Sequence, residues 1–368
     1  MLTQGIYHCL LLLINLFLLY SIWRDSYTSF LHFFVLAGIG AFAAVFLAII
    51  LTGTLEGSIS ANFVLHGLAW HGSVFLFVSS LLMYRQRKND GKPRRCLPSL
   101  IVVIGCMYCG LAVDALLLEP TGLVIREAVI MTPKITKPIT IVFCSDIQTD
   151  SVGCYERRTL QKIKEQNADI ILFGGDYVQG KDEQESRQLV KDLNRLFQEV
   201  DLYAPLGIYA VQGNFDGPLT EMFENTAIIP EESTVTKQIG EIRLTFLSER
   251  DSGRNRSETI HTILDEERGK QFRLMVGHRP RYAMIPQEAD LLLAGHTHGG
   301  QVQIPFWGPI VTASGDLPRR WASGMTVLPS GATLIVSHGS GLERGRAPRL
   351  RFLCRPDFWV IRLVSTQG

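Results

Sequence analysis

Residues 291–301 decide the fold of the C-terminal part of the chain, and they read Leu-Leu-Leu-Ala-Gly-His-Thr-His-Gly-Gly-Gln. A short apolar run ends at Ala294, and His296 and His298 follow it between glycines. Glycine allows the sharp backbone turn that lets a side chain project from the end of a strand. An apolar strand followed at once by His-x-His predicts metal-ligating side chains at the edge of a sheet.

Four other apolar runs end in the same way, with a polar side chain just beyond them. The residues concerned are Asp146 and Gln148, Asp176, Asn214 and Asp216, and His278. In open α/β sheets, ligands bind outside the carboxyl ends of the strands. Carboxylates, amides and imidazoles together suit a pair of Mn, Fe or Zn ions better than a single Mg or Ca ion. The alternative is that the histidines are ordinary core or turn residues, and five ligand-bearing strand ends in order disfavour it.

Short runs rich in β-branched residues alternate with helix-like segments from residue 139 onward. The expected strands are 139–144, 169–173, 208–211, 242–247, 272–276, 290–294, 333–337 and 358–363. The expected helices are 155–166, 183–200, 218–224, 257–268 and 280–287. Continuously apolar strands separated by helices indicate sheets that are covered on both faces, which is typical of the α/β class.

The first 118 residues differ in composition from the 250 that follow. They hold seven Lys or Arg and four Asp or Glu, whereas the rest holds 29 basic and 31 acidic side chains. Four apolar stretches are long enough to cross about 30 Å of hydrocarbon as helices. They are Gly5–Trp23, Phe30–Thr52, Ala61–Tyr84 and Leu97–Leu118. We therefore expect a four-span helical domain over 1–118, a linker over 119–138 and a globular domain over 139–368.

The loops between these spans predict which side of the membrane each part occupies. Six of the seven basic residues of the first part lie in Arg85–Arg95, and the positive-inside rule places this loop in the cytoplasm. With four spans, we expect a multi-pass protein of the cell inner membrane whose globular domain lies on the outer, periplasmic or extracellular, side. The nearly balanced charge of the globular part is not that of a non-specific nucleic-acid binder.

The ligand-bearing strand ends resemble those of the calcineurin-like metallophosphoesterase superfamily, whose pattern is D-x-H, G-D, G-N-H-D/E, H and G-H-x-H. The resemblance extends over Ile139–Leu363. The tail, with Gly339–Leu342 and Arg355–Asp357, is similar to a membrane-associated bacterial branch. That branch includes phosphodiesterases and one form of UDP-2,3-diacylglucosamine pyrophosphatase. The resemblance implies a four-layer α/β/β/α sandwich of two mixed sheets, here preceded by four transmembrane helices.

The same resemblance implies a role for each matching residue. The implied metal ligands are Asp146, Gln148, Asp176, Asn214, His278, His296 and His298. Asp146 and His298 would bind the first of two divalent ions, with Gln148 in the position of a family histidine. Asp176 would bridge both ions, and the other three ligands would hold the second. Mn is the favoured metal for both ions. A hydroxide between the ions would attack the phosphorus atom.

Two residues depart from the family pattern. Gln148 replaces a histidine ligand, and an amide oxygen shifts the preference toward a harder metal such as Mn or Mg. Phe215 replaces the histidine that binds phosphate and assists the leaving group, and it has no proton to donate. Either the leaving group is already good, as in a pyrophosphate, or Asp150 or His338 serves as the donor. Asp216 would support the site from behind the ligands.

These observations lead to two hypotheses from different classes. The first is a membrane-anchored phosphohydrolase that cleaves a phosphodiester or pyrophosphate, with a lipid-linked or nucleotide-sugar lipid as substrate and membrane lipids as partners. Asp176, Asn214, Asp216 and His338 are its predicted catalytic residues. The second is a metal- and phosphate-binding membrane sensor with weak catalysis, which the departures at Gln148 and Phe215 favour. The oligomeric state has no signal in the sequence.

Two further groups of residues have two interpretations each. The arginines 319, 320, 344, 346, 349, 351 and 355 would contact anionic head groups or form an ordinary solvated face. Phe306, Trp307 and Trp321 follow the His-x-His segment in a Gly/Pro-rich region. They would enter the lipid interface, where aromatic rings are favoured, or pack the loop.

Overall fold

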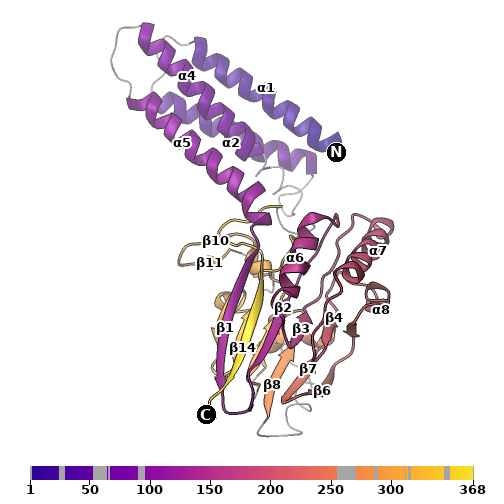
Figure 1. The fold of residues 1–368 in the computed structure, drawn as a ribbon. Coiled ribbons are helices and arrows are strands. Elements are labelled where there is room, and N and C mark those ends of the chain that lie inside the picture. The colour runs from indigo at the N-terminus through magenta and orange to yellow at the C-terminus, as the bar shows by residue number, and fades with distance from the viewer. Residues whose placement is uncertain are drawn as a thin grey trace. The chain divides into compact units, whose positions relative to one another are not determined.

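The structure is a computed structural model of the chain. It describes residues 2–24, 30–52, 64, 67–89, 96–254, 271–285, 289–310, 312–313, 316–343 and 349–367. The chain divides into two compact units. The first is made of Met1–Leu118 with Glu343–Arg349, and the second of Glu119–Leu342 with Leu350–Gly368. Figure 1 shows helices in the first unit and sheets with helices in the second.

The first unit is helical wherever residues up to Leu118 are described. Its elements are α1 (Leu2–Arg24), α2 (Phe30–Thr52), the π-helical segment η1 (Gly67–Gly72), α4 (Ser73–Asn89), α5 (Cys96–Val113) and the π-helical segment η2 (Asp114–Leu118). Three described helical runs are long and apolar enough to cross a membrane, namely Gly5–Arg24, Gly67–Gln86 and Pro98–Thr121. The remaining predicted span is α2, which contains a shorter apolar run over His32–Ala48.

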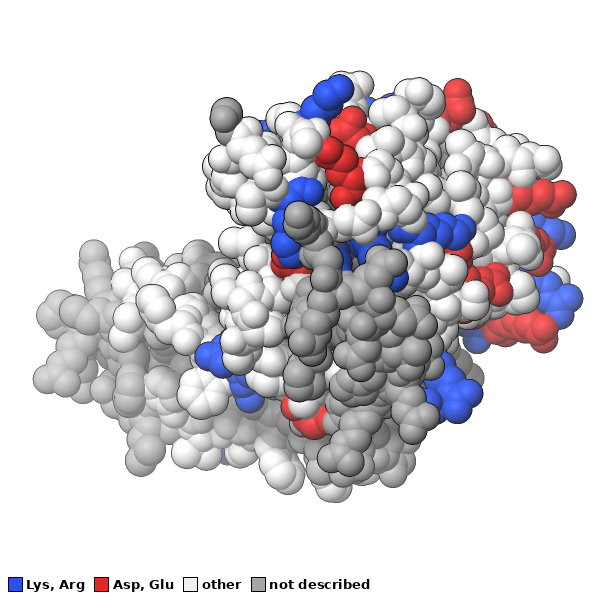
Figure 2. All heavy atoms as spheres, turned by 90° about the horizontal axis from the view of Figure 1, so that it is seen from below, with Lys and Arg blue, Asp and Glu red and all other residues white. Residues whose placement is uncertain are grey.

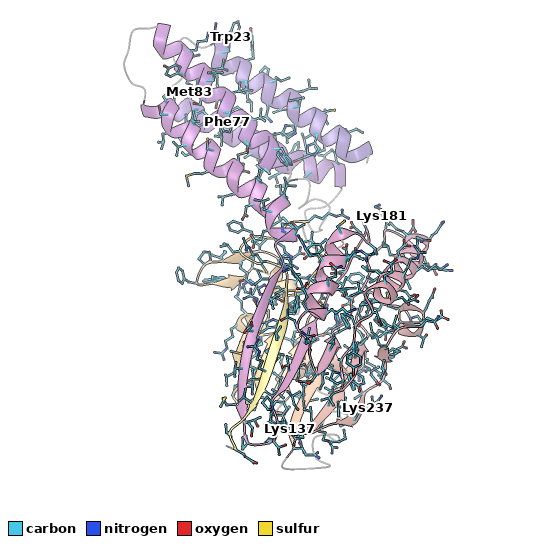
Figure 3. All side chains as sticks on the ribbon, viewed as in Figure 1. Trp23, Phe77, Met83, Lys137, Lys181 and Lys237 are labelled. Carbon is cyan, nitrogen blue, oxygen red and sulfur yellow. The ribbon has the colours of Figure 1, made fainter. Side chains whose placement is uncertain are left out.

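The helices of the first unit expose apolar side chains that a bundle in water would bury. Met83 is buried within the unit, whereas Phe17, Phe42 and Leu81 are 71, 69 and 66% exposed. Trp23, which Figure 3 labels together with Met83, is also largely exposed. Large contiguous apolar surfaces of this kind are typical of surfaces that contact lipid or another protein.

The second unit contains two six-stranded sheets. The first has the order β1 (Val124–Thr132), β14 (Asp357–Ser365), β2 (Ile139–Cys144), β3 (Ile170–Phe173), β4 (Ile208–Val211) and β5 (Ile228–Glu231). The second has the order β12 (Gly324–Val327), β13 (Thr333–Val336), β9 (Leu291–Ala294), β8 (Phe272–Val276), β7 (Ile242–Phe246) and β6 (Val235–Ile239). Both sheets are mixed, because β14 is antiparallel to β2, β12 to β13 and β6 to β7, while the other neighbours are parallel.

Apolar side chains form three clusters around these sheets. Alternate residues of a strand point to opposite faces, so Val142 faces the helices and Phe143 faces the second sheet. The helices on the outer face of the first sheet are α6 (Cys154–Lys164), α7 (Glu183–Val200) and α8 (Leu219–Met222). The outer face of the second sheet packs against the short helices η4 (Pro280–Met284) and η6 (Arg319–Trp321). The helices, the first sheet and the second sheet therefore follow one another as in the first three layers of the predicted α/β/β/α sandwich.

All eight predicted strands are present, with their ends within two residues of the predicted bounds. The structure adds β1, β5, β6, β12 and a small hairpin of β10 (Gln303–Ile304) and β11 (Gly308–Pro309). Helix α7 has its predicted bounds. The predicted helix 257–268 lies outside the described residues, and only residues 280–284 of the predicted helix 280–287 are helical in the described part.

The prediction of a linker over 119–138 is wrong for its central part. Residues Val124–Thr132 form β1, an edge strand whose nine residues all pair with β14. Val129 and Met131 are more than half exposed, so the segment lacks the continuous apolar run that identified the other strands. The strand exists because β14, far along the chain, supplies its hydrogen-bonding partner.

The pairing of β1 places the beginning of the second unit at a defined edge of the first sheet. Val124, the first residue of β1, pairs with Asp357, the first residue of β14. Trp359, two residues later, pairs with Phe143 near the end of β2. The chain therefore enters the first sheet on the side formed by the carboxyl ends of β2, β3 and β4, as Figure 1 shows.

Candidate metal centre

The predicted ligands occupy the loops after five strands. Asp146 and Gln148 follow β2, Asp176 follows β3, Asn214 follows β4, His278 follows β8, and His296 and His298 follow β9. Parallel neighbours within each sheet bring these loops to one edge. The contact between Asp176 and His278 then joins the edges of the two sheets.

Five of the predicted ligands have the left-handed backbone conformation that side chains other than glycine rarely adopt. Their φ angles are 52° at Asp146, 38° at Gln148, 55° at Asp176, 69° at His296 and 48° at His298. Such conformations cost of order 1–3 kcal/mol each and gather at functional sites. The backbone is therefore held in an unfavourable shape at the positions that the sequence predicts as ligands.

Four of the ligands converge on one point between the sheets. The Nε2 atom of His278 lies 3.2 Å from Asp176 Oδ2 and 3.2 Å from Asn214 Oδ1. The rings of His278 and His296 are 5.0 Å apart between centroids. One ligand atom each of Asp176, His278 and His296 lies within 4.8 Å of the others, a spacing that a single metal ion can span.

Asp146 and His298 form a second group beside the first. The Nε2 atom of His298 is 3.5 Å from Asp146 Oδ1, and both side chains are buried. The backbone N–H of His296 donates to both carboxylate oxygens of Asp146, at 3.1 and 3.0 Å. Ser145 Oγ also donates to this carboxylate, at 2.6 Å. Ser145 is not among the residues predicted for the site, although it directly precedes Asp146 in the sequence.

The hydrogen bonds of His278 test whether a cation fits this site. Its Nδ1 lies 2.8 Å from the carbonyl oxygen of Gly174, which can only accept, so Nδ1 carries a proton. Two oxygens face the opposite nitrogen, and they require a positive charge there, either a proton or a metal ion. A histidine that donates one ring N–H to a carbonyl is the usual form of a metal ligand.

His298 presents its two ring nitrogens to different surroundings. Its Nε2 atom faces Asp146 Oδ1, whereas its Nδ1 atom is buried without a hydrogen-bond partner among the residues that the structure describes. The donor set of carboxylates, an amide and imidazoles, with Nε2 of His298 beside the Asp146 carboxylate, fits divalent metal ions.

The charges of the cluster point to the same conclusion. Burial raises the pKa of Asp146 to about 7. Burial disfavours a charged His278, but attraction to Asp176 outweighs it and raises the pKa of His278 to about 10. Burial, together with the nearby Arg351 cation, holds the pKa of His298 well below its usual value. A divalent cation would favour the ligating, deprotonated form of each of these groups.

Asp216 holds the ligand loops from behind. Its Oδ2 accepts the backbone N–H groups of Asp176 and Gly213, both at 2.7 Å, and its Oδ1 accepts that of Tyr177 at 2.9 Å. Gly213 has no room for a side chain, because a Cβ there would lie 2.2 Å from Asp176 Oδ1. Asp216 is thus placed as a positioning residue rather than as a group within the ligand cluster.

The two departures from the family pattern have different environments. Gln148 is fully buried, and its backbone N–H donates to the carbonyl oxygen of Asp176 at 2.9 Å. The backbone N–H of Phe215 donates to Asp176 Oδ1 at 2.9 Å, while its side chain is 40% exposed. Phe215 therefore orients the Asp176 carboxylate through its backbone, which any residue at this position would do.

The structure does not bring His338 into the ligand cluster among the contacts of the described residues. Its Nε2 lies 2.7 Å from Ser323 Oγ, and its Nδ1 lies 3.0 Å from the carbonyl oxygen of Arg355. Asp357 accepts the backbone N–H of His338 and the hydroxyl of Ser337. Both ring nitrogens thus have protein partners, and a part for His338 in proton donation stays a prediction.

The arginines and aromatic residues of the tail separate into buried and exposed groups. Arg351 is fully buried and donates to the carbonyl oxygens of His338 at 2.7 Å and of Cys354 at 2.9 Å. The prediction that it contacts head groups or solvent is therefore wrong. Arg319, Arg320, Arg349 and Arg355 are exposed, and Arg344 and Arg346 lie outside the described residues. Trp321 packs in the outer cluster of the second sheet, whereas Phe306 and Trp307 are exposed.

A polar hollow of about 610 Å³ adjoins the loops after β4 and β7. Its lining includes Gln212, two residues before Asn214, and the cations Arg250 and Arg254. Figure 2 shows one face of the molecule, on which acidic and basic side chains are interspersed. The described residues on that face form no large area of one charge sign.

Comparison with known proteins agrees with this geometry. The model of the calcineurin-like phosphoesterase family matches residues 139–300. Metallophosphoesterase YkuE of Bacillus subtilis (strain 168) is 31% identical over 217 residues, which cover 55% of this chain and 71% of YkuE. Phosphodiesterase YaeI of Escherichia coli (strain K12) is 25% identical, over 54% of this chain and 72% of YaeI. A metallophosphoesterase of Helicobacter pylori (strain ATCC 700392 / 26695) is 24% identical, over 93% of this chain and 91% of its own. The chain belongs to the calcineurin-like phosphoesterase family and is a metal-dependent phosphoester hydrolase.

Proposed function

We propose that this protein is a membrane-anchored, two-metal phosphohydrolase that cleaves a phosphodiester or pyrophosphate bond in a lipid-linked substrate. The observation that carries the proposal is the edge of the first sheet at which the chain arrives. The last apolar helical run ends at Thr121, and β1 begins three residues later at Val124. Three residues span at most about 10 Å. The chain therefore passes within a few residues from the last apolar helical run into the ligand-bearing end of the first sheet, which supports a substrate that is itself held in a membrane.

The ligands divide into two sets for two divalent ions. Asp146 and His298, with Gln148, would hold one ion, and Asn214, His278 and His296 the other, with Asp176 shared between them. When bound, the two ions would activate a water molecule for attack on phosphorus and neutralise charge on the phosphate oxygens. Mn is the favoured metal because oxygen ligands are numerous in a set that also contains imidazoles.

The protein's own groups favour a substrate with a good leaving group. Phe215 occupies the position of the family's proton-donating histidine, and its side chain has no proton to give. A general acid contributes about 10²–10⁴-fold to the rate when the leaving group is an alkoxide. A phosphate leaving group needs little such help, so a lipid-linked pyrophosphate or a nucleotide-sugar lipid is the preferred substrate class.

The topology that we propose has four spans. Helix α2 (Phe30–Thr52) has 23 residues and no Asp, Glu, Lys or Arg, so at about 1.5 Å per residue it is long enough to cross the hydrocarbon. The basic segment Arg85–Arg95 would lie in the cytoplasm by the positive-inside rule. Four spans would then place the second unit on the outer side of the inner membrane.

The test uses the full chain in lipid nanodiscs with bis-p-nitrophenyl phosphate and Mn²⁺. We expect chelator-sensitive turnover that is abolished by Asp176→Asn and retained by Asp192→Asn, a surface change on α7. Absence of chelator-sensitive turnover, or full turnover in Asp176→Asn, would contradict the proposal. A panel of lipid-linked pyrophosphates and soluble nucleotide sugars in the same nanodiscs then separates the substrate classes.

The second candidate, a sensor with weak catalysis, rests on the side chains of Gln148 and Phe215. It requires metal binding without efficient turnover on any member of the panel. Metal analysis of the same samples distinguishes the two, because a sensor would hold about two ions per chain and stay inactive.

A further inference from the structure

The hairpin of β10 and β11 carries an exposed apolar tip. Phe306 is fully exposed, Trp307 is 64% exposed, and Ile304 and Ile310 are 47 and 50% exposed. The chain turns through Phe306 with a φ of 66°, which is rare for a bulky residue. Backbone conformations of this kind cost of order 1–3 kcal/mol and cluster at functional sites. We name residues 304–310 the aromatic tip.

Hydrogen bonds fix the base of this hairpin near the point where the chain enters the second unit. Gln303 N–H donates to the carbonyl oxygen of Phe352 at 2.9 Å, and Leu353 N–H donates to the Glu119 carboxylate at 2.9 Å. Glu119 is buried and belongs to the last apolar helical run, Pro98–Thr121. Figure 1 shows β10 and β11 beside the beginning of β1. The aromatic tip therefore stands at the end of the second unit that the last apolar run enters.

The charges around the aromatic tip match a phospholipid surface. The guanidinium carbon of Arg319 lies 5.3 Å from the centroid of the Trp307 ring, and its Nη1 donates to the carbonyl oxygen of Pro309 at 2.5 Å. Arg320 beside it is exposed. Tryptophan rings gather at the head-group level of bilayers, and arginines near the surface are attracted to anionic lipids.

We propose that the aromatic tip inserts into the head-group region of the bilayer. The inference rests on the membrane anchoring proposed above and adds a second contact with lipid, made by the catalytic unit itself. The helical spans would hold the second unit only through the chain segments that join the two units. A second contact would fix the ligand-bearing edge next to the membrane surface, where the phosphate of a lipid-linked substrate lies.

The experiment places the photo-crosslinking residue p-benzoylphenylalanine at Phe306 in the full chain. The matched control carries it at Tyr203, which is 76% exposed and precedes β4, at the opposite edge of the sheet. Both proteins are reconstituted in nanodiscs of phosphatidylcholine and phosphatidylglycerol, irradiated and examined by mass spectrometry. Both positions are exposed, so the exchange leaves the core unchanged.

We expect about tenfold more lipid adduct at position 306 than at position 203, because only an interfacial ring stays in contact with lipid. Equal yields at the two positions, or adducts of position 306 with a second protein chain in place of lipid, would overturn the inference. Carbonate extraction of membranes containing the same proteins tests the membrane anchoring separately from the contact of the aromatic tip. Release of the chain by carbonate would contradict the proposed anchoring. Retention of the chain together with equal adduct yields would contradict only the lipid contact of the aromatic tip.

Discussion

Replacing Asp216 by asparagine tests whether the ligand loops are positioned through the backbone. The Asp216 carboxylate accepts three backbone N–H groups, from Asp176 and Gly213 at 2.7 Å and from Tyr177 at 2.9 Å. Asparagine keeps one acceptor oxygen and turns an NH₂ group toward the others. At least one backbone N–H in the site therefore loses its partner in Asp216→Asn.

The expected magnitude follows from this count. An unsatisfied buried N–H costs about 1–3 kcal/mol, and the remaining bonds lose the strength that a charged acceptor adds. Burial and repulsion from Asp176 raise the pKa of Asp216 to about 7, so the neutral amide relieves part of this cost. We expect a loss of about 2 kcal/mol in local opening free energy, which is about 30-fold faster amide exchange.

Hydrogen exchange with mass spectrometry on the full chain at pH 8 measures this change, because Asp216 is ionised there. Peptides that contain residues 176, 177 and 213 should exchange faster in Asp216→Asn, and bound metal or turnover should fall about 10–100-fold. The control is Asp192→Asn, whose carboxylate accepts from the side chain of Gln188. Exchange and metal content that match the control would refute the positioning role.

Three further predictions concern the site and its support. Gly213→Ala should lose metal and turnover because a Cβ there would lie 2.2 Å from Asp176 Oδ1. Gly217→Ala is the control and should keep both, because no atom lies within 4 Å of a Cβ at that position. Metal analysis measures the difference, and equal metal content in the two variants would contradict the geometry. Phe215→His should raise turnover on esters with poor leaving groups by up to about 10²-fold at constant metal content, and unchanged kinetics would show that no proton donor is missing. Arg351→Met should strongly lower the midpoint of thermal unfolding, because several buried carbonyl groups lose their hydrogen-bond donor. Arg349→Met, at an exposed position, is the control and should leave the midpoint unchanged. Equal melting curves for the two variants would exclude a stabilising role of Arg351.

Local sequence was sufficient wherever an element depends on its own residues. The core strands could be predicted because most of them are continuously apolar, and glycine with a polar residue follows closely after β3, β4, β8 and β9. Helix α7 could be predicted because Leu189, Leu193 and Leu196 form one apolar stripe and Asp182 caps its N-terminus. The edge strand β1 could not, because its partner β14 lies at the other end of the chain and its exposed residues carry no continuous apolar pattern.

Residue types and their order along the chain are enough to identify which strand ends bear carboxylate, amide and imidazole groups, and which third of the chain is apolar enough for lipid. How these groups combine depends on the folded arrangement. It set His278 against Asp176 and Asn214, gave Asp216 a backbone role, buried Arg351 and left the aromatic tip exposed. The physical reason is that residue type and spacing are local properties, whereas distance and burial depend on the pairing of strands that are remote in the chain.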